Sequence, residues 1–134
     1  AEHEIKLNQL MGFFQIKNFD SSKIKFNKKI YLAIKKNKNN YRWTYLSNEN
    51  CPKHEIFNFE NFDEAYHRLI LELFQILKKS ISVIFDECIK KIYVEGGFSK
   101  NKIFIKILKI NYPNHKIIIN TISNASSRGA AMLI

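Results

Sequence analysis

Gly96 and Gly97 are the residues whose surroundings most favour ligand chemistry. They follow the β-favouring run 91–95 and precede Ser99 and an apolar helical pattern. Ligands of open α/β sheets collect at the carboxyl ends of strands, and helix N-termini offer unpaired N–H groups to anions. Paired glycines let a phosphate or ribose approach the backbone closely, but they also occur where a turn needs a positive φ. We place a nucleotide at this turn, with both explanations open.

Other catalytic constellations are absent from the sequence. There is no G-x-x-x-x-G-K-[ST] phosphate loop and no G-x-G-x-x-G fingerprint. His3-Glu4 lacks the second histidine of H-E-x-x-H, and no serine has the G-x-S-x-G setting. The acidic residues Asp63, Asp86 and Glu87 are expected on solvated helix faces. We therefore name no catalytic residue.

The cysteines and the lack of a long apolar run indicate where in the cell the protein is expected. Cys51 and Cys88 stand far apart in the sequence, with no second cysteine near either, which indicates no zinc site and no disulfide framework, and favours a reduced, cytoplasmic location. No run approaches the roughly 18 apolar residues of a membrane span, so no membrane partner is expected. Ala1 begins inside a helical pattern and Ile134 ends on an apolar run, which predicts a part of a larger protein.

The chain carries a formal charge of +10, from 22 Lys and Arg against 12 Asp and Glu. The lysines are dispersed among many Asn and Ile, which is typical of a composition bias more than of a nucleic-acid interface. The aromatic run 41–46 keeps an alternative open. Tyr41, Arg42, Trp43 and Tyr45 could stack single-stranded nucleic acid, although ordinary packing also explains them.

The first two thirds of the chain is expected to contain helices and loops. Apolar spacing predicts a helix over 4–14, and Ser22 could cap a second helix or a turn before the polar stretch 35–40. Asn61, with Glu64 three residues on, predicts the start of a long amphipathic helix that reaches Cys88, on the order of 40 Å. His67 lies one position from its apolar stripe and is interpreted as structural.

The last third alternates strand and helix. The pattern predicts a strand over 91–95, a helix capped by Ser99, a turn containing Pro113 and a buried strand over 115–120. A final helix starts at Ser123 or Asn124. Strands joined by a crossover helix pair in parallel, so this part of the chain is expected to be α/β.

Four stretches carry a family resemblance. VEGGFSKN (94–101), IFIKIL (103–108) and NASSRGAA (124–131) resemble the end of FGGY-family carbohydrate kinases, whose patterns are D/E-G-G-x-S-x-N and A-x-A-x-G-A-A. AEHE (1–4) is similar to the Glu-His-Glu segment of rhamnulokinase-like members.

The resemblance implies a truncated C-terminal domain of a two-domain sugar kinase with the actin/hexokinase-like, ribonuclease-H-like fold. Residues 1–134 would form this single domain, with a helical and loop part over 1–60 and the long helix and nucleotide-binding βαβα part over 61–134. ATP and Mg²⁺ would be its cofactors. The whole protein would transfer the γ-phosphate of ATP to a hydroxyl of a small sugar, a deoxysugar or ketose such as rhamnulose.

The resemblance also assigns site residues. Gly96 and Gly97 would contact the ribose or α-phosphate, Asn101 would lie beside the adenine, and Phe98 and Ser99 would shape the turn. The Asp-Gly-x-Thr phosphate loop and the catalytic aspartate of the family have no counterpart in 1–134, and Arg128 stands where the family has an apolar residue. The chain alone is therefore expected to be inactive. A non-catalytic scaffold that has lost the nucleotide is a third interpretation.

Overall fold

The computed structural model describes residues 2–36, 59–82, 88 and 90–120. The aromatic run 41–46 and the expected last helix lie outside these residues. Contacts divide the chain into two compact units, Ala1–Phe19 with Phe26–Ser80, and Asp20–Lys25 with Ile81–Ile134. We describe each unit by itself.

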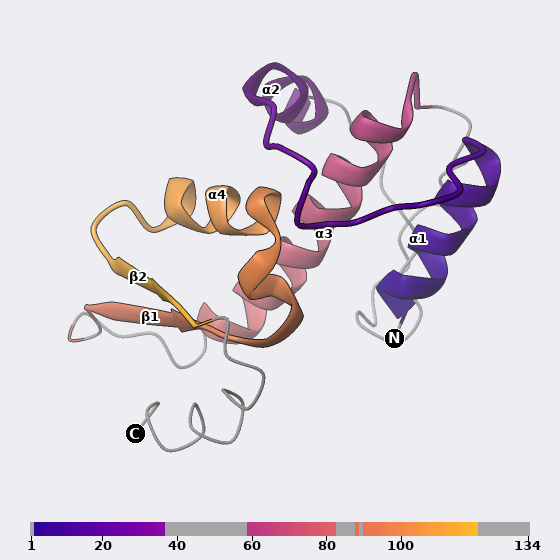
Figure 1. Ribbon diagram of the computed structural model, residues 1–134. Coiled ribbons are helices and arrows are strands. Elements are labelled where there is room, and N and C mark those ends of the chain that lie inside the picture. Colours follow the sequence, from indigo (N-terminus) through magenta and orange to yellow (C-terminus); the bar gives the residue numbers. More distant parts are fainter. Residues whose placement is uncertain (1, 37–58, 83–87, 89, 121–134) are drawn as a thin grey trace. The chain divides into compact units, whose positions relative to one another are not determined.

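The first unit contains three helices, α1 (Glu2–Phe13), α2 (Lys28–Lys36) and α3 (Phe62–Ser82) (Figure 1). The predicted first helix is confirmed, but its apolar residues are unequally covered. Leu10 is fully buried, whereas Ile5 and Phe13 are exposed. The spacing in α1 therefore predicts the helix better than it predicts the core.

Helix α2 is capped by Asn27 and not by Ser22. Asn27 Oδ1 accepts the backbone N–H groups of Lys29 at 3.0 Å and Ile30 at 3.2 Å. Ser22 instead closes a turn with Asp20, whose Oδ1 accepts both the Ser22 backbone N–H and its hydroxyl. These hydrogen bonds hold the pKa of Asp20 below its usual value, with Lys23 and Lys100 adding to the effect. The Ser22 side chain is thus engaged by Asp20. The helix begins after Asn27, whose side-chain oxygen accepts the first backbone N–H groups.

The predicted start of α3 is confirmed. Asn61 Oδ1 accepts the Glu64 N–H at 2.8 Å, as an N-cap residue does. The described helix ends at Ser82, about 32 Å from its start at 1.5 Å per residue. The expected extension of a buried face to Cys88 is wrong, because Cys88 is exposed and lies in a turn.

The middle of α3 is buried on all sides. Every residue of 65–74 is buried, so a one-sided apolar stripe does not describe this stretch. Three of its buried residues are polar or charged: His67, Arg68 and Glu72. Buried polar groups are stable only when they are hydrogen-bonded.

Hydrogen bonds across the first unit meet that need. Arg68 Nε lies 3.1 Å from Glu72 Oε2, and Arg68 Nη1 donates to the Ile34 carbonyl at 2.7 Å. His67 Nε2 accepts the Asn27 N–H at 3.0 Å, and its Nδ1 lies 2.7 Å from the Asp63 carbonyl. The structural interpretation of His67 is thereby confirmed. Arg68 therefore connects α3 to the C-terminal end of α2, and His67 connects α3 to the residue that caps the N-terminal end of α2.

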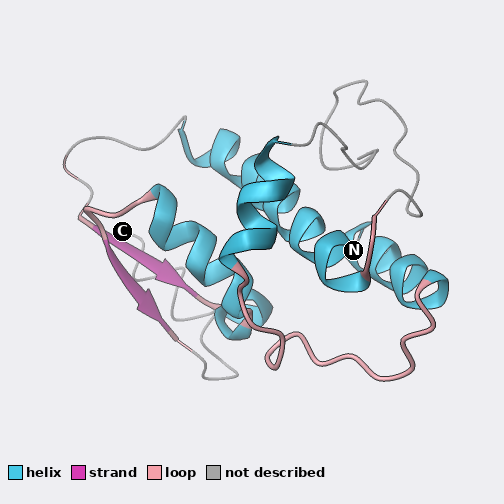
Figure 2. Ribbon diagram, turned by 90° about the horizontal axis from the view of Figure 1, so that it is seen from above, coloured by secondary structure: helices cyan, strands magenta, loops and turns pink. Residues whose placement is uncertain are grey.

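The second unit is a parallel βαβ arrangement, as predicted. Strand β1 (Lys91–Val94) leads into a 3₁₀ helix, η2 (Gly96–Lys100), then α4 (Lys102–Asn111) and β2 (Lys116–Ile119). The strands pair in parallel, from Lys91 opposite Lys116 to Val94 opposite Ile119, and lie side by side in both views (Figure 1 and Figure 2). The described part of the chain is therefore of mixed α and β structure.

Strand β2 is less buried than its run of isoleucines predicts. Ile117 and Ile118 are half-buried and Ile119 is 41% exposed. Parallel strands are continuously apolar when a sheet has neighbours on both faces and edges. Within the described residues the sheet has two strands, and Ile119 keeps an accessible surface.

No helix in the described ranges is both long enough and apolar enough to span a membrane.

Candidate functional site

The turn that follows β1 is shaped by Gly96. Its φ is +74°, a region that glycine occupies without the steric penalty of a side chain. The Ser99 hydroxyl donates to the Gly96 carbonyl at 2.6 Å and closes the turn. Ser99 therefore lies inside a 3₁₀ helix, and the prediction that it caps the following helix is wrong.

Asn101 is the cap of α4. Its backbone is extended, with φ −84° and ψ 106°, and its Oδ1 accepts the Phe104 N–H at 3.0 Å. Its side chain is buried, at 3% exposure. One oxygen of the residue expected beside an adenine is thus engaged in starting the helix. The adenine contact itself stays a prediction.

The positive φ that explains a glycine at position 96 does not explain Gly97. Its φ lies outside the positive range, and a Cβ added there would meet no described atom within 4 Å. Neither backbone strain nor contact with the described residues accounts for glycine at this position. The backbone of Gly97 is therefore open to close approach from outside.

Phe98 has a packing role that the sequence reasoning did not identify. Its ring stacks on that of Phe104, with centroids 4.8 Å apart and planes inclined by 29°. Phe98 is half-buried. The contact holds the turn against the first turn of α4.

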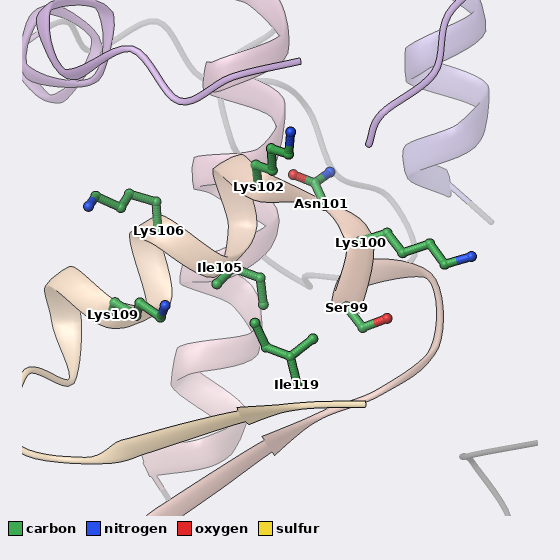
Figure 3. A pocket seen from close by; sticks show the side chains of 8 residues that line it. All are labelled: Ser99, Lys100, Asn101, Lys102, Ile105, Lys106, Lys109 and Ile119. Atoms are coloured by element: carbon green, nitrogen blue, oxygen red, sulfur yellow. The ribbon is translucent and has the colours of Figure 1, made fainter. Parts of the chain in front are cut away.

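A pocket of about 260 Å³ opens beside this turn, between α4 and the end of β2 (Figure 3). Ser99, Asn101, Ile105 and Ile119 supply part of its lining. The rest is supplied by four lysines: Lys100, Lys102, Lys106 and Lys109. The pocket lies at the carboxyl end of β2, where ligands of parallel sheets are found.

Two of the five predicted site residues, Ser99 and Asn101, line this pocket, whereas Gly96, Gly97 and Phe98 do not. The sequence reasoning missed the lysines. A signal was present, because positions 102, 106 and 109 are spaced i, i+4 and i+7 and so share one helix face. Among so many dispersed lysines this spacing did not stand out.

The chemistry of the pocket is cationic. Its lining residues include no carboxylate, and all four lysines are exposed. Over the ranges that the structure describes, no group of three or more His, Cys, Asp or Glu side chains could hold a metal ion. The charge of these lysines suits the binding of an anion.

No family model, curated protein or solved structure matches the chain.

Proposed function

We propose that this chain is the C-terminal, ATP-binding portion of an FGGY-type carbohydrate kinase with the actin/hexokinase-like fold. The observation that carries the proposal is the Gly96–Gly97 turn at the carboxyl end of β1, in a parallel βαβ unit, with an approachable backbone at Gly97. The motif resemblance adds the sugar-kinase chemistry. The whole protein would transfer the γ-phosphate of ATP to a hydroxyl of a deoxysugar or ketose such as rhamnulose.

The roles of the residues follow from their positions. Gly96 sets the direction of the turn through its positive φ, and Ser99 holds that turn closed. Gly97 would then offer its backbone to the ribose or α-phosphate. Mg²⁺ would accompany the nucleotide and neutralise charge on its phosphates, since phosphoryl transfer depends mainly on positioning and electrostatics. The residues described here would bind and orient the nucleotide.

The test is a pair of glycine variants of the 134-residue chain. Gly97→Ala meets no described atom and needs no positive φ, so we expect unchanged stability and an affinity for Mg·ATP that is lower by about tenfold. Gly96→Ala forces an L-residue into the left-handed region and should cost about 1–2 kcal/mol of stability. Calorimetric titration with Mg·ATP and urea unfolding measure the two effects.

Wild-type affinity in a folded Gly97→Ala variant would contradict the proposal. Failure of the folded wild-type chain to bind Mg·ATP would contradict it as well, and would favour the non-catalytic scaffold.

A further inference from the structure

One exposed face of α4 is uniformly cationic. Lys102, Lys106 and Lys109 follow one another on successive turns, and the helix contains no acidic residue. At 1.5 Å per residue, the first and last of these lysines start about 10 Å apart along the axis. Within the described ranges, none of the three forms an ion pair. Their charges are therefore available to a ligand.

Two isoleucines line the pocket together with the lysines. The side chains of Ile105 and Ile119 point toward one another, while those of Lys100, Lys102 and Lys106 extend outward in different directions (Figure 3). Ile119 is 41% exposed and Ile105 only 8%. An apolar surface next to the amines lowers the local dielectric constant and strengthens their attraction for an anion.

The spacing of the lysine charges along α4 favours an extended anion over a compact one. A single phosphate is compact and could meet the amines of one or two helical turns. A chain of linked phosphates distributes its charge along a line and could meet lysines on all the turns. Lysine suits this use because its ammonium group acts as a point charge on a flexible stem.

We propose that this lysine pocket binds a small anion with two or more linked phosphates. The inference goes beyond the proposed function, because Gly96 and Gly97 do not line the pocket. The phosphate chain could belong to a free polyphosphate or to the tail of a bound nucleotide.

The first experiment titrates the 134-residue chain with sodium phosphate, pyrophosphate and tripolyphosphate at low ionic strength, followed by amide chemical shifts. We expect affinity to rise with phosphate number and the shift changes to gather on η2, α4 and the end of β2. Equal affinities for phosphate and tripolyphosphate, or changes spread over both units, would overturn the proposal.

The second experiment removes the charges. The variant with Lys102→Gln, Lys106→Gln and Lys109→Gln should bind tripolyphosphate about tenfold more weakly. A matched control replaces Lys28, Lys29 and Lys36, three exposed lysines of α2, with Gln and should lose less than about twofold. Equal losses in the two variants would show attraction to the net charge alone and refute the site.

A third variant tests whether a loss of binding comes from the lost charge or from a misfolded chain. Lys→Arg at positions 102, 106 and 109 keeps the charge and should keep tripolyphosphate binding, whereas Lys106→Gln alone should lose about twofold. Loss of binding in the folded arginine variant together with no loss in Lys106→Gln would also refute the site.

Titration with Mg·ATP separates the two sources of the phosphate chain. Weaker ATP binding in the triple glutamine variant identifies the nucleotide tail, and unchanged ATP binding identifies a free polyphosphate. The proposed function fails separately, when Gly97→Ala leaves ATP affinity unchanged while tripolyphosphate still binds the lysines.

Discussion

His67 is a buried histidine held in one protonation state by its two hydrogen bonds. A backbone N–H can only donate, so the Asn27 N–H requires Nε2 to accept, and the proton lies on Nδ1 facing the Asp63 carbonyl. Burial lowers the pKa of His67 below its ordinary value, against a smaller opposing effect of the Asp63 carbonyl and carboxylate. A second proton would bind to Nε2 and turn it into a donor. That donor would then face the Asn27 N–H, which is itself a donor.

We predict a pH-dependent loss of stability from this residue. Well above the unfolded pKa of about 6.5, His67 is neutral in the folded and unfolded chains, and the stability is full. As the pH falls below that value, the unfolded chain takes up a proton that the folded chain does not. The free energy of unfolding should therefore decrease, by at most about 1.4 kcal/mol per pH unit, until the folded pKa is reached. Urea unfolding between pH 7.5 and 5.0 measures this decrease.

The matched comparison uses His67→Gln and His3→Gln. The first variant should lose stability at pH 7.5 and show a shallower pH dependence, and the second should behave as the wild type does. An unchanged pH dependence in His67→Gln would show that another group is responsible.

At the scale of elements, α4 depends on a cap that is also a candidate ligand residue. Asn101 Oδ1 satisfies the Phe104 N–H, one of the backbone donors that a helix start leaves unpaired. Asn101→Ala should cost about 1 kcal/mol of stability and weaken hydrogen-exchange protection in α4, while Asn101→Ser should retain most of both.

The same pair separates the two roles of Asn101. If its amide contacts the adenine, the serine variant should bind Mg·ATP more weakly than the wild type while its stability stays near that of the wild type. Equal destabilisation by serine and alanine would show that capping is not the main structural role of the side chain.

At the scale of the whole molecule, the formal charge of +10 opposes compaction. Salt shortens the range of this repulsion to about 10 Å at 0.1 M, whereas the buried Arg68–Glu72 pair is little screened. Raising NaCl from 20 to 300 mM should therefore raise the melting temperature by a few degrees. Thermal unfolding followed by circular dichroism measures the change.

The α2 triple glutamine variant is the control for this prediction. It removes three of the positive charges and should gain less from salt than the wild type. A melting temperature that falls with salt would show that surface ion pairs outweigh the net repulsion.

Local patterns in the sequence were enough to predict most of the described elements. The presence of α1, the start of α3, both strands and their parallel pairing follow from apolar spacing, from the Asn61 cap and from the crossover helix between the strands. The helices and the strands depend mainly on residues a few positions apart, whereas the pairing of the strands joins residues about 25 positions apart, from Lys91 opposite Lys116 to Val94 opposite Ile119. The caps of α2 and α4 were missed because Ser22 and Ser99 are as suitable as Asn27 and Asn101 by residue type alone. Only the structure shows that both serines are engaged elsewhere.

What the sequence determined by itself is the open glycine turn after a strand, because its backbone requirements are local. Tertiary structure decided which polar residues of α3 are buried, and it brought Ile119 to the lysines of α4. Both depend on residues far apart in the chain: His67 is paired with Asn27, and Arg68 with Ile34. Helical periodicity records which face of a helix is apolar, but not what covers the opposite face or which strand end lies beside it.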